Sequence, residues 1–336
     1  MGREMSSATL LRDGFGRQIT YLRLSVTDRC NFRCVYCMPE KMRFLPRTQV
    51  LSAEELFQVG AAFVALGVNK IRLTGGEPLV NPDLPWLVEN LAGLPGLDLL
   101  MLTTNGERLG IHAKPLKAAG LDRINISLDS LRPERFAELT RTGRLKRVLE
   151  GIGAAQQAGF ERLKLNAVIL RGRNDDEILE LIRFARREVL DITFIEEMPL
   201  GYINEHDRKL SFVSSEQIRT TISNEFPLLP TLENTGGPAR YHRMEDSSIS
   251  VGFISAHSNN FCGSCNRVRV TAEGRLLLCL GNEHSIDLRQ VLRESPNDPD
   301  TLKNKIRQAM SLKPERHRFD LNEAPQIVRF MNMTGG

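Results

Sequence analysis

The sequence predicts an α/β protein: an open or partial (β/α)6 barrel of the TIM type with an α+β extension toward its C-terminal end. Strand-like and helix-like patterns alternate six times between residues 19 and 195, which indicates a parallel sheet with right-handed crossovers. A doubly wound sheet would carry a glycine-rich fingerprint after its first strand, and a cysteine-rich loop stands there instead. The alternation stops near residue 211, so we expect residues 1–210 to form the barrel and residues 211–336 the extension.

The first strand and the first helix carry the clearest local signals. Residues 19–26 alternate with period two, which places apolar side chains on one face and Tyr21 and Arg23 on the other. Residues 52–55 form a capping box that opens an apolar-periodic helix ending at Gly67. Later strands are expected at residues 70–74, 97–103, 123–128, 163–170 and 192–195, and helices at 84–91, 112–119, 133–139, 145–158 and 176–188.

The extension has weaker patterns. We expect a helix at residues 215–225, a loop at 234–239, a strand at 248–256, and a hairpin at 267–280 with its turn at 272–274.

The loop after the first strand holds Cys30, Cys34 and Cys37 in the spacing C-x3-C-x2-C. Thiolates are the ligands of iron–sulfur clusters, and a four-iron cluster normally takes four of them. Three cysteines would leave one iron open to another ligand. Zinc sites are usually closed by four ligands built from C-x2-C pairs. The spacing therefore favours a cluster over zinc.

A second cysteine triplet lies in the extension, at Cys262, Cys265 and Cys279. Here zinc remains a real alternative, because a C-x2-C pair plus one cysteine across a hairpin resembles a zinc knuckle. His257 or His284 could then close a Cys3His site.

Arg267 and Arg269 follow this triplet and are two residues apart on an expected strand, so they share a face. Arginine is suited to bidentate phosphate binding. The alternative is a solvated basic strand.

Polar motifs fall where the expected strands end, which is where active sites gather in parallel barrels. In T-G-G-E-P at residues 74–78, two glycines allow a close approach of the backbone to a ligand, and the Glu77 carboxylate could accept from an ammonium group. In S-L-D at residues 127–129, Ser127 and Asp129 could face a ribose. The strand-end candidates are Cys30, Gly75, Thr103, Asp129, Asn166 and Met198.

Composition limits the possible partners. The net charge of +4 is mild, which favours a small anionic ligand over a long nucleic acid. No apolar run reaches the roughly 18 residues that span a bilayer, and residues 1–17 lack the apolar core of a secretion signal. The six cysteines form two distant triplets rather than a disulfide framework. We expect a cytoplasmic protein with two metal centres.

The first triplet, with Tyr36 before its last cysteine, resembles the signature of the radical S-adenosylmethionine (SAM) enzymes. The combination of C-N-F-R-C-V-Y-C-M-P, L-T-G-G-E-P, T-T-N-G, S-L-D, K-L-N, F-C-G-S-C-N-R-V-R and Cys279 is similar, more narrowly, to the GTP 3′,8-cyclase family. The match runs from about Tyr21 to Cys279, and the sequence ends in Gly335-Gly336, as in that family.

The resemblance implies a set of site residues. It implies a 4Fe–4S cluster at the first triplet, which cleaves SAM, and a second 4Fe–4S cluster whose open iron faces the guanine of GTP. The implied ligands and contacts are Cys30, Cys34 and Cys37 for the first cluster; Cys262, Cys265 and Cys279 for the second; Tyr36, Gly76, Ser127 and Met198 for SAM; and Arg23, Arg72, Thr103, Lys164, Arg267, Val268 and Arg269 for GTP.

The resemblance also implies a reaction and partners. A 5′-deoxyadenosyl radical abstracts the ribose 3′ hydrogen of GTP, and the product is (8S)-3′,8-cyclo-7,8-dihydroguanosine 5′-triphosphate, in the first step of molybdenum cofactor biosynthesis. The implied partners are a reductant protein such as flavodoxin or ferredoxin and a cyclic pyranopterin monophosphate synthase that takes the product. Neither nucleic acid nor membrane is expected, and the protein would be a monomer or homodimer.

One position departs from the family pattern. Thr193 stands where the family carries an arginine that helps to bind SAM, which puts that contact in doubt.

Two rival functions remain. A peptide-modifying radical SAM enzyme would have a peptide-binding element and more auxiliary cysteines, neither of which is found. The other rival is a non-enzymatic zinc protein.

Overall fold

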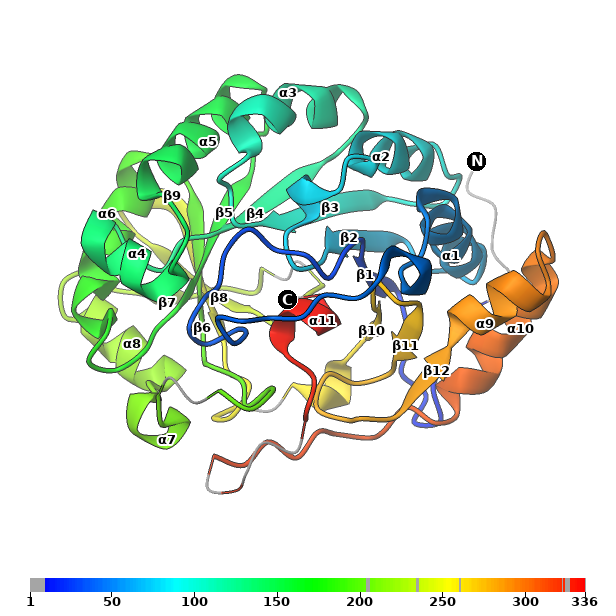
Figure 1. Ribbon diagram of the computed structural model, residues 1–336. Coiled ribbons are helices and arrows are strands. Elements are labelled where there is room, and N and C mark those ends of the chain that lie inside the picture. Colours follow the sequence, from blue (N-terminus) through cyan, green and yellow to red (C-terminus); the bar gives the residue numbers. More distant parts are fainter. Residues whose placement is uncertain are drawn as a thin grey trace.

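The computed structural model describes residues 10–203, 206–233, 236–259, 261–321, 323 and 327–335. Its centre is a ring of parallel strands surrounded by helices (Figure 1). This part of the chain contains no helix that is long and apolar enough to cross a membrane.

The predicted strand–helix alternation is confirmed. Six parallel strands stand side by side in chain order, and their helices lie outside them (Figure 1). The strands are β1 (Tyr21–Ser25), β2 (Lys70–Thr74), β3 (Leu99–Thr104), β4 (Arg123–Ser127), β5 (Leu163–Val168) and β6 (Asp191–Ile195), and the helices are α1 (Ala53–Ala65), α2 (Leu84–Ala92), α3 (Leu109–Ala118), α4 (Pro133–Thr140), α5 (Leu145–Gln157) and α6 (Ile178–Arg187).

Local signals account for the element ends. The Ser52 hydroxyl accepts from the Glu55 backbone at 3.2 Å, and the Glu55 carboxylate accepts from the Ser52 backbone at 2.8 Å, so the predicted capping box opens α1. Helix α3 begins at Leu109, three residues before its predicted start. Leu109 is fully buried, so the first turn of the helix packs against the core.

The extension adds strands to both edges of the same sheet. Strand β10 pairs in parallel with β1, and β9 pairs in parallel with β6, so eight neighbouring strands run in one direction. The remaining strands continue the two edges as antiparallel pairs. The strands of the extension are β7 (Leu229–Pro230), β8 (Arg240–Met244), β9 (Ser247–Ile254), β10 (Arg267–Val270), β11 (Arg275–Leu277) and β12 (Ser285–Asp287).

Most predicted elements of the extension are present. Helix α8 (Ser215–Ser223), β9 and the β10–β11 hairpin match the expectation, and the expected loop at 234–239 is described only from Gly236 onward. Strand β8 and the helices after the hairpin were not predicted, although Asp298 and Pro299 form a recognisable helix start. The other helices are α7 (Arg208–Ser211), α9 (Leu288–Glu294), α10 (Pro299–Met310) and α11 (Met331–Thr334).

The C-terminal segment returns to the barrel. Figure 1 places α11 in the middle of the ring. The Met331 backbone donates to the Cys37 carbonyl at 3.3 Å, and the Asn332 amide donates to the Asp28 carbonyl at 3.0 Å. The chain end therefore packs against the cysteine loop.

Candidate active site

One pocket fills the inside of the barrel and reaches both cysteine triplets. All of the site residues expected from the sequence line it, including those more than 200 positions apart. They are Cys30, Cys34, Tyr36, Cys37, Gly76, Ser127 and Met198, together with Arg23, Arg72, Thr103, Lys164, Cys262, Cys265, Arg267, Val268, Arg269 and Cys279.

The first triplet lies in a turn after β1. The Cys37 backbone donates to the Cys34 carbonyl at 3.0 Å, and the Phe32 backbone donates to the Cys30 sulfur at 3.3 Å. Burial, together with neighbouring groups that become negative, raises the pKa of all three thiols, that of Cys37 to about 12. Half-buried thiols with raised pKa values need a positive centre before they can carry charge. An iron cluster supplies one, so these residues fit the expected group.

Tyr36 and Asp129 join this loop to the far side of the barrel. The Tyr36 hydroxyl donates to Asp129 at 2.7 Å, and the Val168 backbone donates to the other oxygen of the same carboxylate at 2.8 Å. Burial raises the pKa of Asp129 to about 6. The Asp129 carboxylate, which we expected to face a ribose, thus holds Tyr36 in position.

The two glycines after β2 are required by packing. A Cβ atom on Gly76 would lie 2.3 Å from the Arg29 carbonyl oxygen, and one on Gly75 would lie 2.5 Å from that of Thr27. The backbone of this motif therefore runs directly against the start of the cysteine loop.

The neighbouring Glu77 carboxylate lines the pocket and also contacts the ends of two strands. It accepts from the Thr104 hydroxyl at 2.6 Å, the Asn105 backbone at 2.6 Å and the Leu79 backbone at 2.9 Å. Burial raises its pKa to about 7. These contacts use the carboxylate to connect the ends of β2 and β3.

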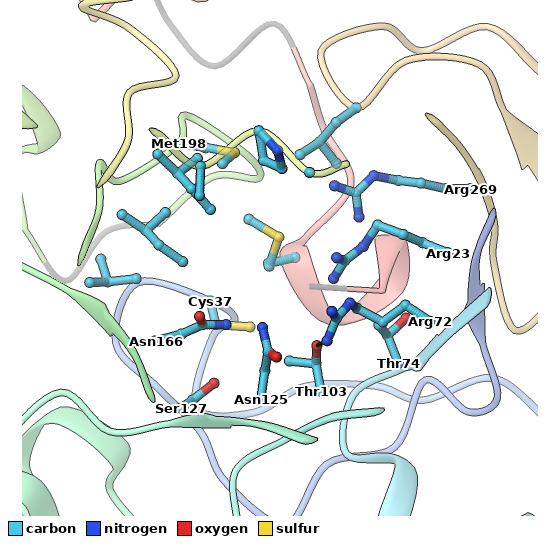
Figure 2. Close-up of a pocket in the computed structure, with 18 of the residues that line it drawn as sticks. Arg23, Cys37, Arg72, Thr74, Thr103, Asn125, Ser127, Asn166, Met198 and Arg269 are labelled. Atoms are coloured by element: carbon cyan, nitrogen blue, oxygen red, sulfur yellow. Dashed lines mark hydrogen bonds between the residues drawn. The ribbon is translucent and has the colours of Figure 1, made fainter. Parts of the chain in front are cut away.

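Arginines from three neighbouring strands form a row on one side of the pocket. Strand pairing puts Arg23 of β1 opposite both Arg72 of β2 and Arg269 of β10. Figure 2 shows these three guanidinium groups pointing into the pocket, across from Met198, Asn166 and Cys37. Burial and mutual repulsion lower the pKa of Arg23 to about 10 and that of Arg269 well below its usual range. One buried and two half-buried cations in a row make a site for an anion.

Tyr21 belongs to the same row, and its role was not recognised from the sequence. Arg72 donates to the Tyr21 hydroxyl at 2.6 Å and to the Thr103 hydroxyl at 3.3 Å. Burial would raise the pKa of Tyr21, but Arg72 and Arg23 outweigh it and lower the pKa to about 8. Its place beside Arg23 in the period-two pattern was the signal that could have identified it.

Cationic side chains contact two residues of the second triplet. The Arg17 guanidinium donates to the Cys262 carbonyl at 2.8 Å, and the Lys313 ammonium lies 3.8 Å from the Cys265 sulfur. Burial would raise the pKa of Cys265, but Arg267 and Lys313 outweigh it, and the pKa is lowered. Burial, with Cys262 and Cys265 as further causes, raises the pKa of Cys279.

The two histidines that could close a zinc site at the second triplet are placed otherwise. His284 is exposed, and the His257 ring pairs with the Glu197 carbonyl at 2.9 Å. Thiols are the ligands that a four-iron cluster takes, so the second triplet fits the expected cluster.

Thr193 is fully buried on β6, and its hydroxyl has no hydrogen-bond partner. A Cβ atom on Gly252 would lie 2.8 Å from this hydroxyl and 2.9 Å from the Tyr241 ring. Tyr241 in turn accepts from the Lys164 ammonium at 2.7 Å. The small residues at positions 193 and 252 therefore make room for a tyrosine that holds Lys164.

Comparison with known proteins agrees with these features. Residues 24–185 match the model of the Radical SAM superfamily, and residues 190–319 match that of Molybdenum Cofactor Synthesis C. The chain is 62% identical to a GTP 3′,8-cyclase of Pseudomonas entomophila (strain L48), over 97% of this chain and 98% of the relative. It is 60% identical to one of Marinobacter nauticus, over 98% and 99% of the two chains. The fold is similar to that of Streptococcus suis SuiB bound to S-adenosylmethionine, with a TM-score of 0.60 at 14% identity over 94% of this chain and 78% of SuiB.

Proposed function

The chain belongs to the GTP 3′,8-cyclase family of radical SAM enzymes, and from this we propose how its barrel pocket divides between SAM and GTP. The protein converts GTP to (8S)-3′,8-cyclo-7,8-dihydroguanosine 5′-triphosphate in the first step of molybdenum cofactor biosynthesis. Its cofactors are SAM and two 4Fe–4S clusters.

The SAM half of the pocket lies at the first triplet. Cys30, Cys34 and Cys37 hold the cluster that SAM binds, and Tyr36, Gly76, Ser127 and Met198 surround SAM. Gly76 packs against the backbone at the start of the cysteine loop, which puts it beside the proposed SAM site. When bound, SAM and this cluster would supply the radical chemistry that removes the ribose 3′ hydrogen.

The GTP half lies between the arginine row and the second triplet. Arg23, Arg72 and Arg269 neutralise the triphosphate, and Arg267, Lys164, Thr103 and Val268 complete its contacts. Cys262, Cys265 and Cys279 would hold the second cluster, which would supply an open iron for the guanine. The observation that carries this assignment is the row of three guanidinium groups that line the pocket, since their repulsion is relieved by a polyanion.

The protein's own task is to hold GTP with its ribose toward SAM and to keep water out. Orientation of this kind removes much of the entropic cost of bringing reactants together. The segment from Met331 to Gly335 helps to enclose the pocket, because Arg23 donates to the Gly335 carbonyl at 2.9 Å.

The partners are proposed on family grounds. A flavodoxin or ferredoxin supplies electrons, a cyclic pyranopterin monophosphate synthase takes the product, and the protein acts as a monomer or homodimer.

We propose residues 1–210 as the barrel unit and residues 211–336 as the unit that carries the second cluster and the GTP-binding hairpin.

The test is turnover with labelled substrate. The anaerobically reconstituted protein receives SAM, a low-potential reductant and GTP deuterated at the ribose 3′ position. We expect 5′-deoxyadenosine that carries the deuterium and a product isomeric with GTP. GTP deuterated at the 2′ position serves as the control and should transfer no label. SAM cleavage without consumption of GTP would contradict the proposal and favour a different substrate, such as a peptide.

A further inference from the structure

Lys313 is a buried ammonium group beside the second triplet, to which neither the sequence motifs nor the proposed reaction assigns a role. It follows α10, and its side chain is only 3% exposed. Its nitrogen lies 3.0 Å from the Arg267 carbonyl, 2.5 Å from the Leu278 carbonyl and 3.8 Å from the Cys265 sulfur. Three acceptors match the three hydrogens of an ammonium group.

These contacts connect the parts of the second triplet. Arg267 begins β10 two residues after Cys265, and Leu278 lies between the end of β11 and Cys279, so one side chain connects both arms of the hairpin. The adjacent backbone is held as well, because Arg17 donates to the Pro314 carbonyl at 2.7 Å and to the Cys262 carbonyl at 2.8 Å. The segment after α10 is thus a structural part of this site.

The groups that Lys313 contacts are neutral, and the carboxylate that acts on it from a distance, Asp13, is already paired with Arg17 at 2.6 Å. Burying an ammonium group is costly unless it is paired with an anion. Its hydrogen-bond partners in the described structure are two carbonyls and a sulfur, with no carboxylate among them. A 4Fe–4S cluster held by three thiolates carries net negative charge and gains one more on reduction, so the cluster would be the missing anion.

Lys313 differs from the neighbouring cations in one respect. Arg267 and Arg269 line the pocket, whereas Lys313 does not. Its charge therefore acts on the ligands of the cluster without touching the substrate.

We propose that Lys313 is the buried counter-charge of the second cluster: it joins the two cysteine arms and raises the reduction potential of the cluster. This inference rests on the proposed placement of that cluster at Cys262, Cys265 and Cys279. A nearby positive charge and a hydrogen bond to a ligating sulfur both favour the reduced state, because they stabilise the added electron.

The test is a reductive titration of the full-length, two-cluster protein, followed by electron paramagnetic resonance. The second cluster is identified with a variant in which Cys30, Cys34 and Cys37 are replaced by alanine. Lys313→Met should shift the potential of the second cluster to more negative values and leave that of the first cluster unchanged. Lys313→Arg should keep the potential of the second cluster close to its wild-type value. Lys305→Met, which removes an exposed lysine from α10, should leave both potentials unchanged.

An unchanged potential in Lys313→Met, with both clusters present, would overturn the inference and reduce Lys313 to a structural contact. If Lys313→Met does not load its second cluster, Lys313→Gln and Lys313→Arg decide the question: a more negative potential in the neutral variant supports the inference, and equal potentials overturn it. A wild-type protein with only one cluster would overturn the proposed placement itself, and iron analysis distinguishes that result.

Discussion

Replacing Arg269 by alanine tests the proposed triphosphate site most directly. Arg269 is half-buried and lines the pocket, beside Arg23 and across from the SAM side. The alternative is a basic strand with a purely structural role, since Arg269 also lies 3.5 Å from the Thr334 carbonyl. The two interpretations predict opposite effects on GTP affinity.

The expected magnitude follows from two opposing effects. A charge-assisted hydrogen bond to phosphate contributes roughly 1.5–3 kcal/mol, which corresponds to a loss of about tenfold or more in affinity. Removing one guanidinium also relieves repulsion on Arg23, which offsets part of the loss. Arg267 is half-buried like Arg269, but it lies over the Phe261 ring at 5.0 Å and is not paired with Arg23 across the strands. We therefore expect Arg267→Ala to cost less than Arg269→Ala.

The assay is an anaerobic titration of GTP and of guanosine into each variant with both clusters loaded. The loss should be smaller for guanosine, which has no phosphates. Arg275→Ala is the matched control, because Arg275 lies on the same hairpin but bonds to Ser285 and does not line the pocket. Unchanged GTP affinity in both Arg267→Ala and Arg269→Ala would refute the site.

Three further predictions concern the clusters and the arginine row. The anaerobically reconstituted protein should contain about eight irons and no stoichiometric zinc; elemental analysis that finds one tightly bound zinc would remove the second cluster. Cys34→Ser should abolish SAM cleavage, whereas Cys265→Ser should keep uncoupled cleavage and lose cyclisation of GTP; equal loss of cleavage in both, with the first cluster intact, would contradict this division of roles. GTP affinity should fall as the pH rises through about 8, because Tyr21 loses its proton there and the phenolate opposes the triphosphate. Tyr21→Phe should abolish that fall, and a wild-type affinity that stays constant from about pH 7 to about pH 9 would contradict the prediction.

The sequence by itself determined the features that depend on near neighbours along the chain. The cysteine spacing indicated the first cluster, the capping box located the start of α1, and the period-two pattern placed Tyr21 and Arg23 on one face of β1. Each of these signals extends over a few residues, so local geometry is enough to interpret it. The resemblance to a family then supplied the roles of residues that spacing could not assign.

Only the tertiary structure decided which distant groups meet. The pairing of β10 with β1 puts Arg269 beside Arg23, and no local pattern encodes a parallel contact between segments so far apart in the chain. Glu77 carried a plausible ligand-binding signal, yet its carboxylate connects two strand ends. Lys313 followed an unpredicted helix and reached Cys265 only because the chain folds back. Contacts of this kind depend on burial and on acceptors supplied by other segments, so they are determined when the whole chain packs.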